Sequence, residues 1–361
     1  MLPTVLLPAL WLSAAPPAPA APAPAPTRVV KLADDCTLKL LSAAEAAAVL
    51  DAERLEPYVS TLTHVELEIR LGGPLRPEGR KAQLQRLRAM RAASTRDWTD
   101  AEAEYLTTHL RTVHKLLSAE FPGLLPREWK WVKTSGEGDA RFADGYTVDD
   151  LIVLHEGPLG WHRKGNEERA VGLLSRMTFH MLARTRPQIR EKAYPLLGFR
   201  TLTRLDWGGL EPRRLVHPDI RTPVVYTVRD ESGRDVVAAP LLYSGESRFD
   251  PKKGSDLFRY QAFDLFEAEA DPKTGVGRLL DADGKKPERL PRATTRRIYD
   301  AAVAVNSSNV MHPQNILADN FAMLVLLRHP KYGPELRDSI KPELIGRLAA
   351  VLKALPPAKA P

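Results

Sequence analysis

Residues 176–180 of this 361-residue chain are Arg-Met-Thr-Phe-His, and they lie in a run whose apolar residues follow a helical period. Asn166 is a suitable N-cap for this run, because its side chain can accept from N–H groups of the first turn, and Pro187 ends the pattern. Residues four apart share one helix face, so the sequence predicts a helix with Arg176 and His180 one turn apart on the same side.

His180 stands where the second histidine of His-Glu-x-x-His would stand, a helical pattern in which two imidazoles bind one zinc ion. In that pattern the glutamate after the first histidine is the general base for the zinc-bound water. Here Arg176 replaces the first histidine and Met177 replaces the base. A guanidinium stays protonated and has no lone pair for a metal. Losing a positioned general base typically lowers a rate by about 10² to 10⁴.

A second helix is predicted for the run that begins with His312 and Pro313, since proline suits the first turn of a helix. In many two-helix zinc peptidases a glutamate here is the third ligand, and an aspartate four residues later orients the first histidine. Asn315 and Asp319 have that spacing, but Asn315 is an amide. We therefore expect a structural ion pair between Arg176 and Asp319, bridging the two helices. The alternative is that Arg176 is a solvated surface residue and Asp319 caps a local turn.

These two helices and the segments around them resemble bacterial zinc metallopeptidases of the zincin type, which carry His-Glu-x-x-His and Glu-x-x-x-Asp. The similar segments are Lys133–Gly136, Gly145–Thr147, Leu151–Leu154, Arg190–Tyr194, Gly198–Arg200 and, most specifically, Asn306–Ala322. The resemblance implies an α+β, zincin-like fold. In such a fold an active-site helix faces a second helix beside a small β-sheet, here with residues 151–154 as the edge strand, after a mainly helical region.

The departures from the family pattern fall on the residues that would carry out the chemistry. Arg176, Met177 and Asn315 replace two ligands and the base, and His180 is the ligand that remains. The resemblance therefore implies a non-catalytic protein with a degenerate active site and no expected cofactor. We expect it to bind a peptide or an envelope protein, the peptide along strand 151–154. A structural component of an envelope assembly is a further possibility.

An active zinc peptidase with non-standard ligands is the alternative function. His155 and His162 are the candidate ligands, because they precede the helix that carries His180, although their spacing matches no standard zinc pattern. This enzyme would need zinc and at least three His, Asp or Glu side chains that converge on one point. A binding protein needs no such convergence.

The amino terminus has the composition of an export signal. Apolar residues extend to Leu12, and small residues follow with a cleavage candidate at Ala18–Ala20. We expect residues 1–20 to be a signal peptide and residues 21–27 an Ala/Pro-rich spacer, which predicts a secreted or periplasmic protein. An uncleaved amino-terminal anchor is the alternative. No second apolar run is long enough to cross a bilayer.

Composition argues against several other classes of protein. Hydrophobic residues make up 43% of the chain, enough for a substantial core, and a single cysteine excludes an internal disulfide. The net charge is +7, but the basic residues are interspersed with 45 acidic ones. The sequence has no zinc-finger spacing, Gly-rich phosphate loop or aromatic stacking module, so we expect no nucleic-acid partner.

Local patterns divide the rest of the chain. Residues 28–125 are expected to be mainly helical, with capping boxes at Ser42 and Thr99 and one alternating run, Val65–Leu71, that predicts a strand. Residues 126–330 are the zincin-like region, with a strand and loop insertion at about 212–300. Within it, residues 224–228 and 236–239 flank a turn and predict a hairpin. Residues 331–361 are expected to hold a helix and a tail.

Overall fold

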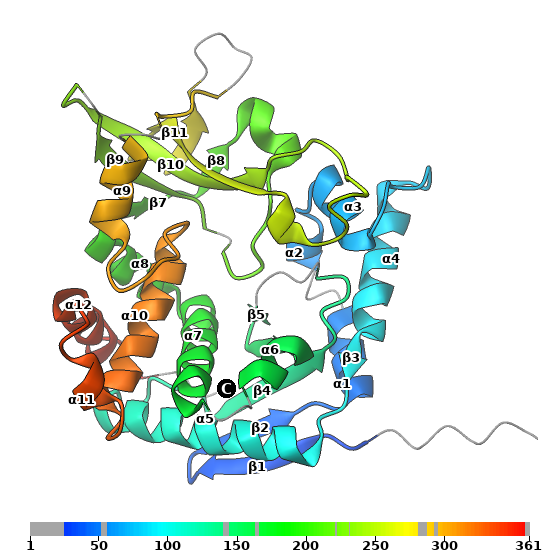
Figure 1. Ribbon diagram of the computed structural model, residues 1–361, viewed down its shortest axis with the longest axis vertical. Helices are drawn as coiled ribbons and strands as arrows, with labels where there is room; N and C mark the ends of the chain where they lie inside the picture. Colours follow the sequence, from blue (N-terminus) through cyan, green and yellow to red (C-terminus); the bar gives the residue numbers. More distant parts are fainter. Residues whose placement is uncertain are drawn as a thin grey trace, which may run out of the picture.

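The computed structural model describes residues 25–51, 56–139, 144–162, 166–220, 222–230, 232–280, 287–291 and 295–357. The expected signal peptide and residues 21–24 of the expected spacer lie outside the described residues. The α+β class expected from the sequence is confirmed, because helices and two separate sheets make up the structure (Figure 1). None of the helices in the described ranges is both long and apolar enough to cross a membrane.

The elements follow one another along the chain in an irregular alternation of helices and strands, with short 3₁₀ turns labelled η. They are β1 (Arg28–Ala33), β2 (Cys36–Leu40), α1 (Ala43–Asp51), α2 (Glu56–Val59), α3 (His64–Leu71), α4 (Arg80–Ala93), β3 (Thr95–Arg96), α5 (Asp100–Glu120), β4 (Glu128–Thr134), β5 (Gly145–Val148), β6 (Leu151–His155), α6 (Glu156–His162), α7 (Glu167–Thr185), α8 (Pro187–Ala193), η2 (Tyr194–Leu197), β7 (Phe199–Thr201), β8 (Arg204–Asp206), η3 (Gly208–Arg213), β9 (Val224–Arg229), β10 (Asp235–Ser244), η4 (Leu257–Arg259), β11 (Gln261–Ala270), β12 (Val276–Leu279), α9 (Thr295–Val303), α10 (Pro313–Arg328), α11 (Gly333–Leu336) and α12 (Pro342–Lys353).

The first sheet has the order β1-β2-β4-β6-β5, with β3 also paired to β4. Strands β2, β4 and β6 are parallel, whereas β5 runs antiparallel to β6 at the edge. The expectation that residues 151–154 form the edge strand is therefore wrong, because β6 has a neighbour on each side. A run of Leu-Ile-Val-Leu that is buried throughout is typical of an interior strand in a parallel sheet.

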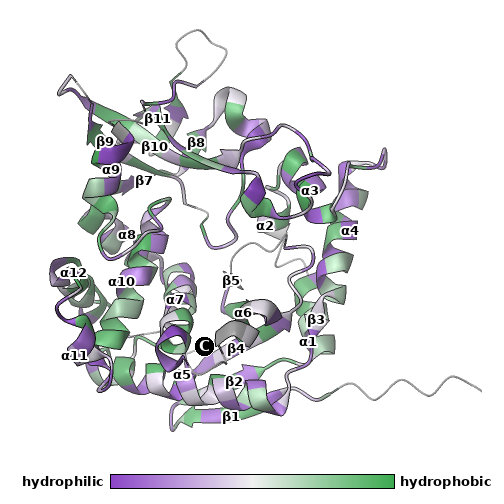
Figure 2. Cartoon of the chain, viewed as in Figure 1, coloured by the Kyte–Doolittle hydropathy of each residue, from purple (hydrophilic) through white to green (hydrophobic). Residues whose placement is uncertain are grey.

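Helices α7 and α10 form the pair expected from the sequence, and Figure 1 shows them side by side. Asn166 caps α7 by accepting from the N–H of Arg169, and His312 caps α10 by accepting from the N–H of Gln314. The rings of Phe179 and Phe321 pack between the two helices with centroids 5.4 Å apart. Hydrophobic stretches of α7, α10 and α12, green in Figure 2, contribute to the largest core cluster.

Residues 64–71 form a helix, α3, so the strand predicted for Val65–Leu71 is wrong. Thr63 accepts from the N–H of Glu66 at the start of α3, and Gly72 ends it with a left-handed φ of 72°. The helix is buried nearly all round, and its alternating charges are buried with the apolar residues. Glu66 and Arg70, one turn apart, form an ion pair with an N–O distance of 2.7 Å.

The second sheet has the order β7-β9-β10-β11-β12-β8 and contains the predicted hairpin, β9–β10. Its two end strands are consecutive in the chain. Leu202 N–H donates to Pro223 O, continuing the β9 ladder, and the next residue, Thr203, donates to Gly275 O beside β12, both at 2.8 Å. One stretch of chain therefore joins both ends of the sheet and curls it into a small barrel around apolar residues that include Leu205 and Phe266.

Candidate functional site

Arg176 and Asp319 meet between α7 and α10. Arg176 Nε lies 2.8 Å from Asp319 Oδ1, with side-chain exposures of 34% and 17%. The Nε–H group has no hydrogen-bond partner in the described part of the chain, so the contact is an ion pair without an aligned hydrogen bond. Ser307 Oγ donates to the other carboxylate oxygen of Asp319. The guanidinium thus lies at the point where the two helices approach each other.

We expect the Arg176–Asp319 pair to contribute little to stability. Water reaches both side chains, so the coupling energy in a double-mutant cycle of Arg176→Ala and Asp319→Ala should be about 0.5–1 kcal/mol. Urea unfolding of the two single variants and the double variant measures it. A coupling energy above about 2 kcal/mol would show that the pair is a major structural link rather than a weak surface-type contact.

Met177 and Asn315 are both packed in the interior of the protein. Met177 is 4% exposed and belongs to the main apolar core, so the position that the resemblance assigns to a base is packed with hydrocarbon. Asn315 is buried as well, and its Nδ2 group donates to Asn309 Oδ1 at 3.3 Å. The resemblance assigns the base to Met177 and the third ligand to Asn315, but the contacts around them are those of a packed interior and a structural amide.

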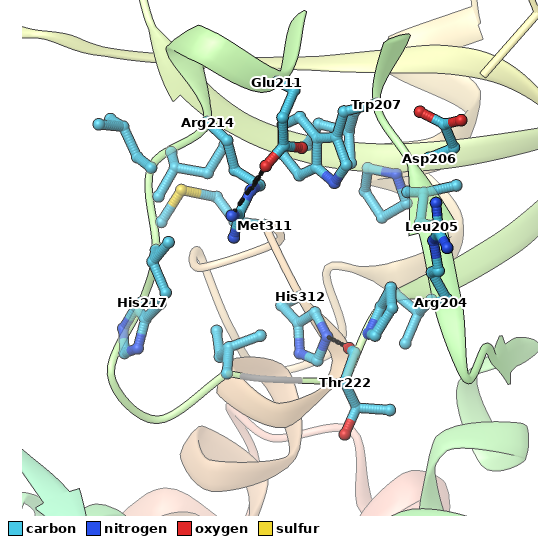
Figure 3. Close-up of a pocket in the computed structure, with 18 of the residues that line it drawn as sticks. Arg204, Leu205, Asp206, Trp207, Glu211, Arg214, His217, Thr222, Met311 and His312 are labelled. Carbon is cyan, nitrogen blue, oxygen red and sulfur yellow. Dashed lines mark hydrogen bonds and ion pairs between the residues drawn. The ribbon is translucent and has the colours of Figure 1, made fainter. Parts of the chain in front are cut away.

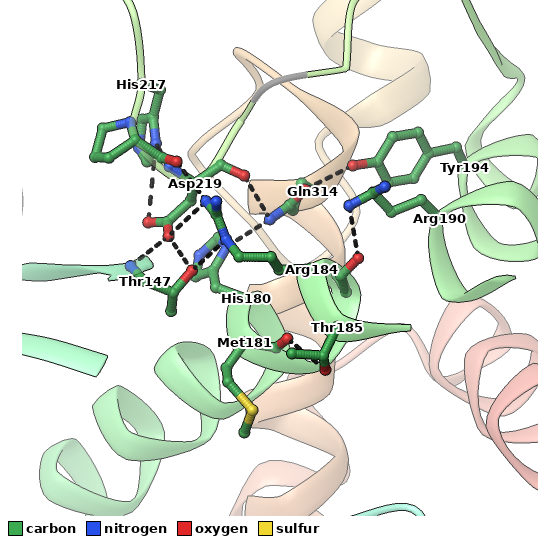
Figure 4. A network of polar contacts seen from close by, with 12 residues as sticks. Thr147, His180, Met181, Arg184, Thr185, Arg190, Tyr194, His217, Asp219 and Gln314 are labelled. Carbon is green, nitrogen blue, oxygen red and sulfur yellow. Dashed lines mark hydrogen bonds and ion pairs between the residues drawn. The ribbon is translucent and has the colours of Figure 1, made fainter. Parts of the chain in front are cut away.

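His180 is held by a neighbour that the sequence did not single out. Gln314 Nε2 contacts His180 Nδ1 at 3.1 Å and donates to Asp219 O, while Gln314 Oε1 accepts from Tyr194 Oη at 2.8 Å (Figure 4). The hydrogen bond from Tyr194 fixes the amide of Gln314 and makes its nitrogen the donor to His180. Burial lowers the pKa of His180 to about 3, and the charges of Arg176 and Arg184 add to the effect. The imidazole is therefore neutral at physiological pH.

The loop between η3 and β9 covers this region and is tied to the edge strand β5. Asp219 Oδ1 accepts from the backbone N–H and the hydroxyl of Thr147, both at 2.6 Å. Arg184 Nε donates to Thr147 Oγ1 at 3.1 Å, and its Nη2 donates to Pro218 O (Figure 4). A carboxylate of the chain itself thus occupies the backbone donor that a bound peptide would need at Thr147.

His217 and His312 complete a set of three neighbouring imidazoles with His180. His217 Nδ1 accepts from the Asp219 N–H at 3.1 Å, and His312 Nε2 contacts Thr222 O at 3.1 Å. Burial lowers the pKa of each to about 3. No motif or spacing in the sequence singled out His217 or Asp219. Gln314 could have been noticed, since it is adjacent to Asn315 in the first turn of α10.

His155 belongs to a different network. Its Nε2 lies 3.4 Å from Asp139 Oδ2, and Arg91 Nε lies 2.9 Å from the other oxygen of the same carboxylate. Burial would raise the pKa of Asp139, but Arg91 and His155 outweigh it and hold the pKa below its usual value. The side chain of His162 lies outside the described residues. Among the residues that are described, no group of three or more His, Cys, Asp or Glu side chains could hold a metal ion.

A cavity of about 480 Å³ lies between the barrel and the start of α10 (Figure 3). Asn315 and His312 line it on the α10 side, and Trp207 lines it on the barrel side. Glu211 and Arg214 also border it and pair with each other at 2.9 Å. Its size is in the range of small-ligand and peptide side-chain sites. The cavity therefore directly adjoins Asn315, and the sequence did not predict it.

No protein-family model, curated protein or solved structure matches this chain. The resemblance to zincin-type peptidases thus rests on the sequence motifs.

Proposed function

We propose that this protein is a secreted or periplasmic, non-catalytic binding protein on a zincin-like scaffold, with a peptide or an envelope protein as its partner. The observation that carries the proposal is the position of Arg176. In the proposed alignment, the guanidinium stands in place of the first ligand and pairs with Asp319, 2.8 Å away. A permanent cation at this point repels a divalent metal and leaves the helix pair without the first ligand.

The cavity beside Asn315 supports a binding role. It is concave, and apolar and polar side chains mix in its lining, as is usual for sites that take part of a peptide or a small molecule. Binding along the edge of β5 is less well supported, because Asp219 already occupies the backbone N–H of Thr147. We therefore place the binding surface at the cavity rather than along residues 151–154.

An active zinc peptidase with recruited ligands is the alternative function. It requires His155 and His180 to converge on one ion. In the described part of the chain, His155 contacts Asp139, whereas His180 contacts Gln314. The geometry thus favours the binding protein over the enzyme.

Metal analysis tests this proposal. We expect the purified protein to carry well under about 0.1 zinc ion per chain by mass spectrometry, and no peptidase activity. The variant Arg176→His with Asn315→Glu should bind about one zinc ion, since it returns two ligands beside His180. Met177 stays unchanged because a glutamate there would bury a carboxylate in the apolar core.

The matched control adds His180→Ala to the same variant and should lose the zinc. Stoichiometric zinc in the unaltered protein would overturn the proposal. Failure of the folded double variant to bind zinc would instead show that the two helices are wrongly aligned with the peptidase motifs.

A further inference from the structure

The excess positive charge of the protein is concentrated in one segment, residues 76–96, which includes α4 and β3. This segment contains seven Arg or Lys residues and a single carboxylate, that of Glu78. The whole chain has 52 basic and 45 acidic residues, so the remainder has 45 and 44 and is nearly balanced. Basic and acidic residues are therefore interspersed in the rest of the chain but not here. Six of the seven net charges come from 21 of the 361 residues.

Helix α4 presents part of this charge on one exposed face. Its buried side contains Leu84 and Leu87, which pack in a hydrophobic cluster with α1 and with strands of the first sheet. Arg91 is also buried, and its charge is met by Asp139. The exposed residues lie within roughly 140° of one another at about 3.6 residues per turn. They form the α4 face, which consists of Lys81, Gln85, Arg86, Ala89 and Ala93.

The cations of this segment are not neutralised by neighbouring carboxylates. The side chains of Lys81, Arg86 and the exposed Arg76 make no ion pair or hydrogen bond within the described part of the chain. Helix α1 packs against α4 and carries two exposed carboxylates, Glu45 and Asp51, neither of which pairs with a described residue of α4. The positive charge therefore faces solvent.

The α4 face is separate from the cavity beside Asn315. In Figure 1, α4 lies at the outer side of the molecule, away from α7 and α10. The described residues that line the cavity belong to other elements. A role for the α4 face is thus independent of the proposed binding function.

We propose that the α4 face docks the protein on the surface of an acidic phospholipid membrane. Lipid phosphates present a laterally mobile array of negative charge, which attracts exposed cations without requiring a shaped pocket. The attraction adds up over a cluster of Lys and Arg residues and falls off within a Debye length, about 8 to 10 Å. A cluster without acidic neighbours on its own helix face is suited to this interaction.

Other polyanions and acidic proteins fit the α4 face less well. Proteins that bind single-stranded nucleic acid combine cations with aromatic side chains on which bases stack. Specific protein interfaces are centred on buried aromatic and Arg anchors that fill pockets. Between its two cations the α4 face has glutamine and alanine, and it has no aromatic residue. It thus provides charge without stacking or anchoring groups, which favours a lipid surface.

Co-sedimentation of the full chain with lipid vesicles tests the proposal. We expect vesicles with about 30% phosphatidylglycerol in phosphatidylcholine to bind the protein about tenfold or more tightly than pure phosphatidylcholine. Lys81→Glu with Arg86→Glu should weaken binding to the acidic vesicles by about tenfold or more. Glutamate is a good helix former, and position 81 lies in the first turn of α4, where a negative charge suits the helix dipole. Circular dichroism checks that this variant is folded.

Lys273→Glu with Arg337→Glu is the matched control, because it changes the net charge equally at exposed sites outside α4. It should keep the affinity within about twofold, since distant charges are screened. The apolar amino terminus is the same in every variant and does not affect the comparison. Equal loss in both double variants would overturn the proposal. Absence of binding to acidic vesicles would also overturn it, and binding to duplex DNA or heparin in the same buffer would then assign the face to another polyanion.

A fluorescent label identifies the side of the protein that contacts lipid. The native cysteine, Cys36, is buried, so a thiol-reactive dye can be directed to Ala89→Cys on the α4 face or to Ser339→Cys beyond α11. In Figure 1, α11 and α4 lie at opposite sides of the molecule. Nitroxide-labelled lipid headgroups should quench the dye at residue 89 at least about twofold more than at residue 339. Equal quenching at both positions would overturn docking through the α4 face even if the vesicles bind the protein.

Discussion

Lowering the pH from 7 to 5 is expected to reduce the free energy of unfolding by about 4 kcal/mol through His180 and His312 alone. Burial lowers the pKa of both side chains from 6.5 to about 3. Between these values the unfolded chain binds more protons than the folded one. Stability is therefore complete above about pH 6.5 and is lost as the pH falls toward 3. Each histidine contributes about 2 kcal/mol over the 1.5 units from 6.5 to 5, at about 1.4 kcal/mol per unit.

Chemical unfolding at both pH values measures this loss. His312→Asn keeps an N-cap acceptor for α10 but removes one titrating group, so it should reduce the pH-dependent loss by about half. His217 is left out of the estimate because its side chain is 13% exposed and water can stabilise its charged form. Equal pH dependence in the wild type and His312→Asn would show that these buried imidazoles do not govern acid stability.

Asp219→Ala is expected to lower the free energy of unfolding by about 3 kcal/mol. The carboxylate is 5% exposed and accepts two hydrogen bonds from Thr147, at 2.6 Å each. Alanine would leave the buried N–H of Thr147 without its acceptor. It would also remove the carboxylate of Asp219 from the surroundings of Arg184, whose Nη2 lies 3.9 Å from Asp219 Oδ1.

Urea unfolding at neutral pH measures the effect, with Asp219→Asn and Asp338→Ala as comparisons. Asparagine keeps an acceptor for Thr147 and should lose about half as much. Asp338 is exposed, so its replacement should change the free energy by less than about 0.5 kcal/mol. If Asp219→Ala proved as mild as Asp338→Ala, the loop would not be anchored at Thr147 in solution.

Patterns within one element predicted the helices correctly where caps and periodicity agreed. Thr99 with Glu102 forms the capping box that starts α5, and Asn166 starts α7 as expected. The same method failed for α3. This helix is buried on nearly all sides, so its charged and apolar residues alternate instead of separating into a polar and an apolar face. Glu66 and Glu68 have backbone partners in distant loops, the N–H groups of Val216 and Phe249. No local pattern can reveal a partner 150 or 181 residues away.

Part of the candidate site could be predicted from local spacing, and the part that depends on distant contacts could not. Spacing along two helices singled out Arg176 and Asp319, and the structure brings them together. Asp219 acts from a loop whose path depends on contacts with α3, β5 and α10. The cavity depends on where that loop leaves the barrel. The position of Asp219 and the cavity both depend on long-range packing, which leaves no repeat or characteristic spacing in the sequence.

The bond between Asp219 and the backbone of Thr147 also bears on how the protein behaves at high concentration. A sheet edge with open N–H and C=O groups can pair with the same edge of another molecule and begin aggregation. Asp219 occupies the Thr147 N–H of β5 and brings a buried negative charge to that edge. Strand β1, at the opposite edge of the sheet, carries Arg28 and Lys31, which pair with Asp100 and Asp34. Charged side chains thus stand at both edges of the first sheet and disfavour its pairing with another molecule.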